Sequence, residues 1–343
     1  MGLIGINLIG NETLRERLYS DIKHGTLSHA YIIEGKKGSG KHILAKNIIA
    51  ALACENKGDS LPCGECKSCR HIFEDKCPDV FTVCREDNKA SIGIEAIRNI
   101  KEELLTLPND LEIKAYIIEE ADLLTIPAQN AFLLTMEDPP KFVSFFLLCE
   151  NARSLLETIR SRAPVLRTEP LSIKEIEDYI CSDKADKNIK DTAVALKRSQ
   201  PDEFSTVLVA ADGSIGQALT LLSPKARKPI SDRRNLAESF ISSLKISGGD
   251  PIALFGKFAG KREELILQFQ CIKEALRDLI VLKKSENAPL SFYADREDAL
   301  ELSSMFFERK LVRVFDQIEK AETAISKNAN IKLTVINLLA SVK

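Results

Sequence analysis

Three runs of apolar residues in the first half of the chain predict buried β-strands. They are "AYIIEG" at 30–35, "AYIIEEAD" at 115–122 and "FVSFFLLCE" at 142–150. The runs are rich in β-branched and aromatic residues and are apolar at consecutive positions rather than at alternate ones. Strands that are apolar on both faces are typical of a parallel sheet between two layers of helices, so the pattern predicts an α/β fold.

Segments with helical spacing of apolar residues alternate with these runs. "HILAKNIIAALAC" follows the first run at 42–54, and "TIPAQNAFLLTMEDPP" at 125–140 separates the second run from the third. In the latter, Thr125 is expected to cap a helix, Pro127 suits its first turn, and the final prolines end it. After about residue 170 the strand pattern fades, and helical stretches are predicted as far as the end of the chain.

The change of pattern predicts more than one domain, because 343 residues are many for a single core. "SPKARKPISDRR" at 223–234 holds two prolines and five basic residues and is interpreted as a linker between domains. The segment after it is expected to be all-helical. Its last helix offers four residues for burial: Ile331, Val335, Leu338 and Leu339.

Composition limits the classes of function. The chain has 48 Lys and Arg against 50 Asp and Glu, so it gives no sign of binding nucleic acid through bulk positive charge. The apolar opening "MGLIGINLIG" ends well short of the roughly 20 residues that cross a bilayer, so no membrane segment is expected. Nine cysteines without a secretory signal favour metal-bound or free thiols in a reducing cytoplasm.

Four of these cysteines form a cluster with the spacing C-x8-C-x2-C-x2-C: Cys54, Cys63, Cys66 and Cys69. Cysteines separated by two intervening residues can aim both sulfurs at one ion, and four thiolates complete a closed tetrahedral zinc site with a structural role. Free thiols beside a helix are the alternative. The five other cysteines are predicted to be small buried hydrophobes: Cys77, Cys84, Cys149, Cys181 and Cys271.

The segment "GKKGSGKH" at 35–42, called the phosphate loop below, has the spacing of a nucleotide-binding loop. Its glycines, Gly35, Gly38 and Gly40, let backbone N–H groups surround phosphates, and Lys41 supplies positive charge. His42 stands where such loops carry the Ser or Thr hydroxyl that binds Mg²⁺. The sequence predicts a degenerate loop.

The cysteine cluster after the loop's helix, together with "SHAYIIEG", "NAFLLTMEDPP" and "TIRSRA", resembles the clamp-loader ATPase family of bacterial DNA polymerase III. The resemblance implies an AAA+ P-loop domain at 1–170 with a zinc knuckle at 54–69, a helical lid at 171–224 and a helical collar at 225–343. It also implies partners: gamma/tau and delta subunits, and, through the assembled complex, the sliding clamp and primed DNA.

Within the family, three positions depart from the ATPases. His42 replaces the Mg²⁺-binding hydroxyl, Glu119 replaces a Mg²⁺-binding Asp, and Gly216 replaces an arginine that reaches nucleotide from the lid. Glu120 matches the water-activating Glu; a strand that runs into a solvated acidic loop is the alternative explanation of "IIEEAD". The departures resemble the delta-prime branch and imply weak or absent ATP binding, without hydrolysis. A gamma-type ATPase that tolerates an altered loop is the alternative.

In "TIRSRA" at 158–163, Ser161 and Arg162 match the family motif whose arginine reaches ATP held by a neighbouring subunit, with Ala163 in place of a cysteine. The resemblance therefore implies that Arg162 acts in trans as an arginine finger, with Ser161 beside it. A surface arginine is the alternative. A P-loop kinase, a different class of protein, would leave the cysteine cluster, this motif and the helical C-terminal third unexplained.

Overall fold

The computed structural model describes residues 4–6, 8–56, 58, 61–86, 89–245, 250–293 and 295–342. Contacts divide the chain into two compact units. The first comprises Met1–Tyr179 and Gly213–Gln217, and the second comprises Ile180–Asp212 and Ala218–Lys343. The division into three domains at 170 and 224 stays a prediction.

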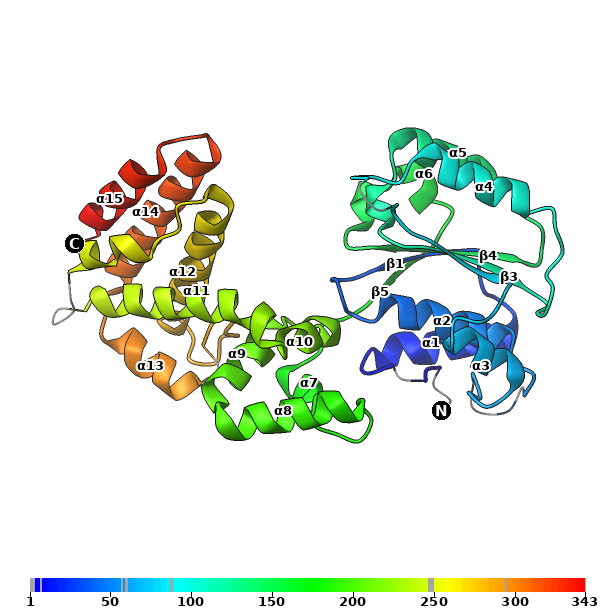
Figure 1. The fold of residues 1–343 in the computed structure, drawn as a ribbon, viewed down its shortest axis with the longest axis horizontal. Helices are drawn as coiled ribbons and strands as arrows, with labels where there is room; N and C mark the ends of the chain where they lie inside the picture. Colours follow the sequence, from blue (N-terminus) through cyan, green and yellow to red (C-terminus); the bar gives the residue numbers. More distant parts are fainter. Residues whose placement is uncertain are drawn as a thin grey trace. The chain divides into compact units, whose positions relative to one another are not determined.

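The first unit is built on a five-stranded, fully parallel sheet of order β2-β3-β4-β1-β5 (Figure 1). The strands are β1 (Ala30–Glu34), β2 (Val80–Val83), β3 (Lys114–Ile118), β4 (Val143–Cys149) and β5 (Val165–Arg167). The three strands predicted from apolar runs are therefore confirmed as β1, β3 and β4. The predicted strand at 115–122 is shorter than expected, because it ends at Ile118 and gives way to a turn.

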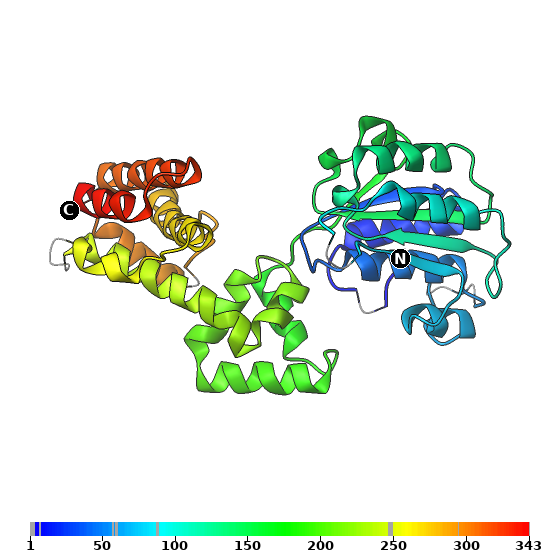
Figure 2. The same cartoon turned by 45° about the horizontal axis from the view of Figure 1, so that its top comes forward.

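Helices cover both faces of this sheet, as the apolar runs predict. Figures 1 and 2 show α1 (Glu12–His24), α2 (Lys41–Leu52) and α3 (Lys67–Phe73) on one face. On the other face lie α4 (Ile94–Glu103), α5 (Ile126–Met136) and α6 (Glu157–Arg160). Short 3₁₀ turns η1 (Ala121–Leu123) and η2 (Ala152–Ser154) follow β3 and β4, and α7 (Ile173–Ile180) follows β5.

Alternate residues of β3 serve two separate cores. Ala115 and Ile117 pack with the cluster that includes α2, whereas Tyr116 and Ile118 pack with the cluster that includes α5. All five residues of β3 are buried. This double burial is the reason that the strand is apolar from Ala115 to Ile118, and it is a property of parallel sheets. Lys114, the first residue of the strand, is also buried, and its Nζ donates to the carbonyl of Glu103 at 2.9 Å.

The second unit is helical within its described residues, as the sequence predicts. It contains α8 (Lys187–Ser199), α9 (Pro201–Ala210), most of α10 (Ile215–Leu221), α11 (Pro224–Ser243), η3 (Pro251–Lys257), α12 (Arg262–Leu282), α13 (Arg296–Ser304), α14 (Glu308–Ser326) and α15 (Ile331–Ser341). Its core forms chiefly from α11, α12, α14 and α15. Val335, Leu338 and Leu339 are buried there, and Ile331 is partly buried against it, as predicted.

The interpretation of residues 223–234 as a linker is wrong. Apart from Ser223, which precedes the helix, the segment forms the first half of α11, with Pro224 in its first turn and Pro229 inside it. The same helix continues into Ala237, Phe240 and Ile241, which are buried in the core of the second unit. That burial outweighs the cost of about 3 kcal/mol that a proline imposes inside a helix.

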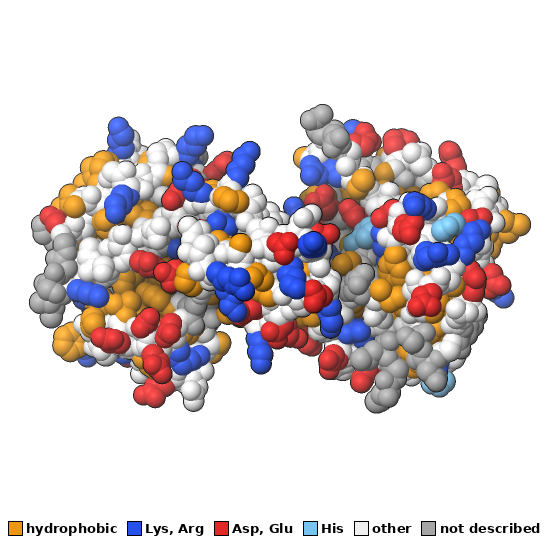
Figure 3. Space-filling model, turned by 60° about the horizontal axis from the view of Figure 1, so that its bottom comes forward, with side chains coloured by type: hydrophobic (Ala, Val, Ile, Leu, Met, Phe, Trp, Pro, Cys, Tyr) orange, Lys and Arg blue, Asp and Glu red, His pale blue; other side chains and the backbone are white. Residues whose placement is uncertain are grey.

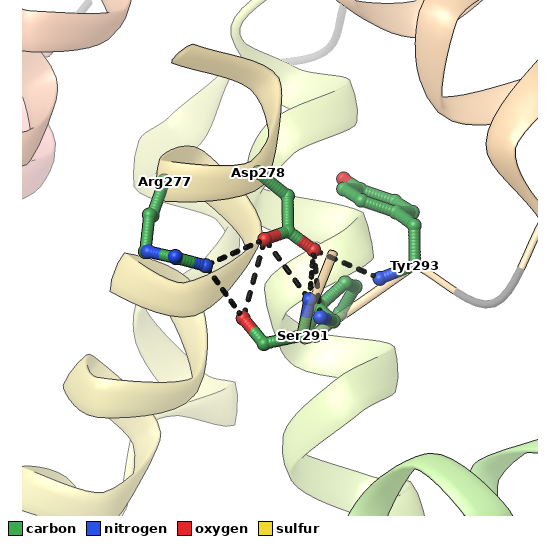
Figure 4. A network of polar contacts seen from close by, with 5 residues as sticks. Arg277, Asp278, Ser291 and Tyr293 are labelled. Atoms are coloured by element: carbon green, nitrogen blue, oxygen red, sulfur yellow. Dashed lines mark hydrogen bonds and ion pairs between the residues drawn. The ribbon is translucent and has the colours of Figure 1, made fainter. Parts of the chain in front are cut away.

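A buried carboxylate fixes the loop that follows α12. Asp278 is fully buried and accepts backbone N–H bonds from Ser291 at 2.9 Å, Phe292 at 2.7 Å and Tyr293 at 3.2 Å (Figure 4). Arg277 approaches the same carboxylate at 3.3 Å. These bonds satisfy a charge that would otherwise be costly to bury.

The outer surface carries both signs of charge. Figure 3 shows Lys and Arg side chains interspersed with Asp and Glu on the face that it presents, in keeping with a formal net charge of -2. Among the described residues, no helix combines the length and the apolar composition that a membrane crossing needs.

Candidate functional site

The phosphate loop connects β1 to α2, the position that its sequence predicts. Gly38 has φ 74° and Gly40, which precedes α2, has φ 86°. These left-handed conformations are readily adopted by glycine alone. Glycine is required at position 35 for a different reason: a Cβ there would lie 1.9 Å from Oγ1 of Thr168. The three predicted glycines are each required by the local backbone or packing.

The side chain of Lys41 folds back onto this loop. Its Nζ donates to the carbonyl oxygens of Gly35 at 2.5 Å and Lys36 at 2.8 Å. Burial lowers the pKa of Lys41 below its ordinary value. In this arrangement the ammonium group neutralises the loop's own carbonyl dipoles rather than facing outward.

His42 and Glu119 meet at the start of α2. Nδ1 of His42 lies 2.7 Å from Oε1 of Glu119, which directly follows β3. Within the described residues Nδ1 makes no hydrogen bond of good geometry, so the contact is a close polar approach. Positions 42 and 119, the two at which the sequence is expected to depart from a Mg²⁺-binding pattern, are thus in contact with each other.

Glu120 adopts a left-handed conformation with φ 47° and points toward Arg85. The two side chains are 3.4 Å apart, and both are partly exposed. The carboxylate of Glu120 is therefore engaged in a partly exposed ion pair.

Residues 213–217 lie against the phosphate loop. The hydroxyl of Ser214 donates to the carbonyl of Lys37 at 2.8 Å, and the N–H of Gly216 donates to the carbonyl of Gly38 at 3.0 Å. A Cβ at Gly216 would lie 2.7 Å from Cα of Gly38. This close packing requires glycine on both sides.

Arg162 lies on a different part of the first unit. Its Nη2 is 3.2 Å from Oε1 of Glu137, and its Nη1 donates to the carbonyl of Thr158 at 3.2 Å. Ser161 turns back to the same carbonyl, with Oγ at 3.0 Å. The side chains of Arg162 and Glu137 are 41% and 45% exposed, so the pair is accessible from solvent.

The four predicted metal ligands converge. The Sγ atoms of Cys54, Cys63, Cys66 and Cys69 all lie within 4.8 Å of one another, and those of Cys63 and Cys69 are 4.0 Å apart. A tetrahedron with Zn–S bonds of about 2.3 Å has edges of about 3.8 Å. The donor set and its spacing therefore fit zinc, whose contribution when bound is to cross-link the segment between α2 and α3.

Backbone N–H groups point at these sulfurs. The N–H of Cys63 donates to Cys54 at 3.5 Å, that of Cys66 to Cys63 at 3.4 Å, and that of Cys69 to Cys66 at 3.4 Å. Burial opposes ionisation of Cys63, but backbone N–H groups outweigh it and lower its pKa to about 6. Burial raises the pKa of Cys54 and of Cys69. A zinc ion bound to the four sulfurs would offset the free-energy cost of burying ionised thiolates.

The prediction for the isolated cysteines is confirmed in part. Cys77 and Cys149 are buried, and burial raises the pKa of Cys149 to about 12. Cys181 and Cys271 are only partly buried. Cys84 is exposed, so its assignment as a buried hydrophobe was wrong. It directly follows the edge strand β2, whose own residues are only partly covered.

Three residues that form contacts at these sites were not predicted from the sequence. Glu137 lies 25 residues from Arg162, Thr168 lies 129 residues from Ser39, and Ser214 lies 177 residues from Lys37. Each contact joins segments that no local spacing relates. Only Glu137 had a sequence feature that could have drawn attention to it, because the prolines that follow it mark the end of α5.

Comparisons with known proteins find subunits of bacterial DNA polymerase III. The profile of a family described as DNA polymerase III, delta subunit, matches residues 10–172. The delta' subunit of Bacillus subtilis DNA polymerase III is 33% identical over 196 residues, which are 55% of this chain and 59% of the relative. The tau subunit of the same organism is 30% identical over 218 residues, which are 63% of this chain and 36% of the relative.

The chain thus spans about a third to three fifths of the length of these two relatives. Among solved structures, a gamma subunit-related protein of DNA polymerase III from Thermotoga maritima is 21% identical. The match covers 95% of this chain and 97% of that chain, with a TM-score of 0.39.

Proposed function

Because the chain belongs to the family of DNA polymerase III clamp-loader subunits, we propose that it is a loader subunit of the delta-prime type. In this role it does not hydrolyse ATP, and it offers Arg162 to ATP bound by a neighbouring subunit. Its partners would be gamma/tau and delta subunits and, through the complex, the sliding clamp and primed DNA.

The observation that carries the first part is the 2.7 Å approach of His42 to Glu119. Mg²⁺ requires oxygen ligands in near-octahedral geometry, and phosphoryl transfer depends on its charge. Residue 42 provides an imidazole in place of a hydroxyl, and that imidazole lies against the carboxylate of residue 119. The residues present therefore do not fit a magnesium nucleotide.

Two further contacts support an inactive pocket. The ammonium of Lys41 is held by the carbonyls of Gly35 and Lys36, so nucleotide binding must break both bonds. Gly216 packs on Gly38 and has no side chain that could reach a phosphate. The loop is better suited to holding residues 213–217 than to holding nucleotide.

The second part of the proposal rests on the exposure of Arg162. A guanidinium placed at a neighbour's phosphates stabilises the charge of the transition state, with effects of about 10³ to 10⁵ in rate in arginine-finger enzymes. Exposed ion pairs are worth roughly 0 to 1 kcal/mol. The contact with Glu137 can therefore orient Arg162 without preventing its transfer to a phosphate.

The test of hydrolysis uses the purified full-length chain. We expect no ATP turnover above background, and we expect the Lys41→Ala variant to behave in the same way. Robust turnover that Lys41→Ala abolishes would instead establish the gamma/tau type, which remains the second candidate because the chain keeps Lys41 and Glu120.

The test of Arg162 uses the loader assembled with its gamma/tau and delta partners. Arg162→Ala should reduce ATP turnover at the neighbouring site by about 10³-fold, since the transition-state charge loses its partner. Arg17→Ala serves as the control, because Arg17 is an exposed arginine in an ion pair with Asp21 on α1. Unchanged clamp-stimulated turnover in the assembled Arg162→Ala complex would contradict the role in trans.

A further inference from the structure

The basic segment at the start of α11 separates into two groups by its contacts. Arg227 is buried, with Nε 2.6 Å from Oε2 of Glu203 and Nη1 3.1 Å from the carbonyl of Leu222. Arg234 lies over the ring of Phe292, with Cζ 4.1 Å from the centroid. Both arginines are engaged in packing within the second unit. The fold therefore accounts for these two cations.

Lys225 and Lys228 are in the other group. They are one turn apart on α11, so they project from the same side of the helix, and both are exposed. Together with Lys257 of η3 they line a groove with a volume of about 650 Å³. Within the described chain, none of the three ammonium groups has a carboxylate within 4.0 Å. The fold does not account for these cations.

The groove differs in sign from the whole chain. Four cations line it, namely the three lysines and Arg233, against two carboxylates, those of Asp232 and Glu264, which leaves a formal charge of +2. Arg233 already faces Glu264 at 3.7 Å, so the lysines supply the unpaired charge. The chain as a whole has a formal charge of -2.

The groove wall indicates the kind of anion. Its described lining has no aromatic side chain on which a base could stack. The amide of Gln268 is already bonded to the backbone, with Oε1 accepting from Ala259 at 2.9 Å and Nε2 donating to Lys257 at 3.4 Å. Lysine ammonium groups attract phosphates as point charges without fixing a planar geometry. These features suit a phosphodiester backbone and offer no aromatic surface for the bases.

We propose that the groove lined by Lys225, Lys228 and Lys257 binds the phosphate backbone of single-stranded DNA without sequence preference. A concavity of about 650 Å³ is on the scale of a small-ligand site, so it has room for a few linked phosphates of one flexible strand and is too small to enclose a duplex. The site does not depend on the phosphate loop or on Arg162, so it stands or falls separately from the proposed function.

The test measures binding of a fluorescent 20-residue oligothymidylate to the full chain by anisotropy at several salt concentrations. The triple variant K225Q/K228Q/K257Q should bind at least about tenfold more weakly. Each phosphate contact on a single strand contributes about 0.7 to the slope of log affinity against log salt, so the slope should fall by about 2. The control is K187Q/K327Q/K332Q, three exposed lysines elsewhere in the second unit.

A variant of opposite sign makes the test stricter. Asp232 lines the groove as a carboxylate, so Asp232→Asn should strengthen binding about two- to threefold by removing like-charge repulsion. Equal weakening by both lysine triples would overturn the proposal, because it would indicate diffuse charge. Three other results would overturn it. Polyglutamate could displace the labelled strand as effectively as unlabelled oligothymidylate does, or a duplex could bind more tightly than the single strand. The third is an affinity of K225Q/K228Q/K257Q equal to that of the wild type.

Discussion

At the scale of the residue, the buried carboxylate of Asp79 fixes the turn that leads into β3. Its Oδ1 accepts the N–H of Asn109 at 2.7 Å, and its Oδ2 accepts those of Asp110 at 2.7 Å and Leu111 at 2.8 Å. Burial opposes ionisation of Asp79, but these backbone donors outweigh it and hold its pKa below the ordinary value. Three loop residues are thereby held by one charge.

We expect Asp79→Asn to destabilise the protein by about 2 kcal/mol at pH 7, because an amide cannot accept all three bonds. A lowered pKa stabilises the fold fully above the unfolded value of about 3.9, and the benefit is lost as pH falls through the folded value. The difference between wild type and variant, measured by denaturant unfolding, should therefore shrink toward pH 3. Asp110→Asn, on the same loop but exposed, should change stability little. A difference that is independent of pH would contradict this account.

At the scale of the element, the cysteine cluster anchors the start of α3 and packs beside Ile6. Cys66 caps α3 through its sulfur. Gly64 has φ 79°, and a Cβ there would lie 2.5 Å from Cδ1 of Ile6. The backbone of Ile6 is in turn held by Asn47 of α2, which accepts its N–H at 2.6 Å. A short helix with so little apolar surface needs this anchoring.

We predict one zinc ion per chain by elemental analysis of the purified protein. Cys69→Ser should lose it, because three thiolates and a hydroxyl hold zinc far less tightly than four thiolates. Hydrogen exchange at α3 should rise at the same time. Cys84→Ser, which changes an exposed cysteine outside the cluster, should keep the metal. Retention of a full equivalent of zinc by Cys69→Ser would refute the four-thiolate site.

At the scale of the whole molecule, each unit has its own core and its own buried carboxylate. Asp278 does for the second unit what Asp79 does for the first, because it gathers backbone N–H groups of residues 291–293 against α12. Disturbing one such group is expected to have a local effect, since the core of the second unit shares no residue with the two cores of the first.

Asp278→Ala should raise amide exchange at residues 291–293 by up to about 100-fold, which corresponds to about 3 kcal/mol for buried N–H groups left without an acceptor. Exchange in β1, β3 and β4 should be unchanged. Arg277→Ala is the matched control, because its guanidinium is half exposed and its loss should cost less than about 1 kcal/mol. Faster exchange across both units would show that the effect is global, contrary to this expectation.

The amino-acid sequence by itself determined the features that depend on neighbouring residues. The three central strands were evident because a strand covered on both faces must be apolar throughout. The phosphate loop and the cysteine cluster were evident because a tight turn needs glycine and a metal needs close ligand spacing. The strands β2 and β5 were missed, since both are short edge strands that bury only part of their surface.

The tertiary structure alone decided which distant residues meet. It brought His42 against Glu119, Gly216 against Gly38 and Arg162 against Glu137, and it turned a proline-containing basic segment into a helix. The physical reason is that such contacts follow from the path of the chain through the whole fold. An apolar pattern in the local sequence shows which face of an element is buried, but it does not show which distant segment packs there.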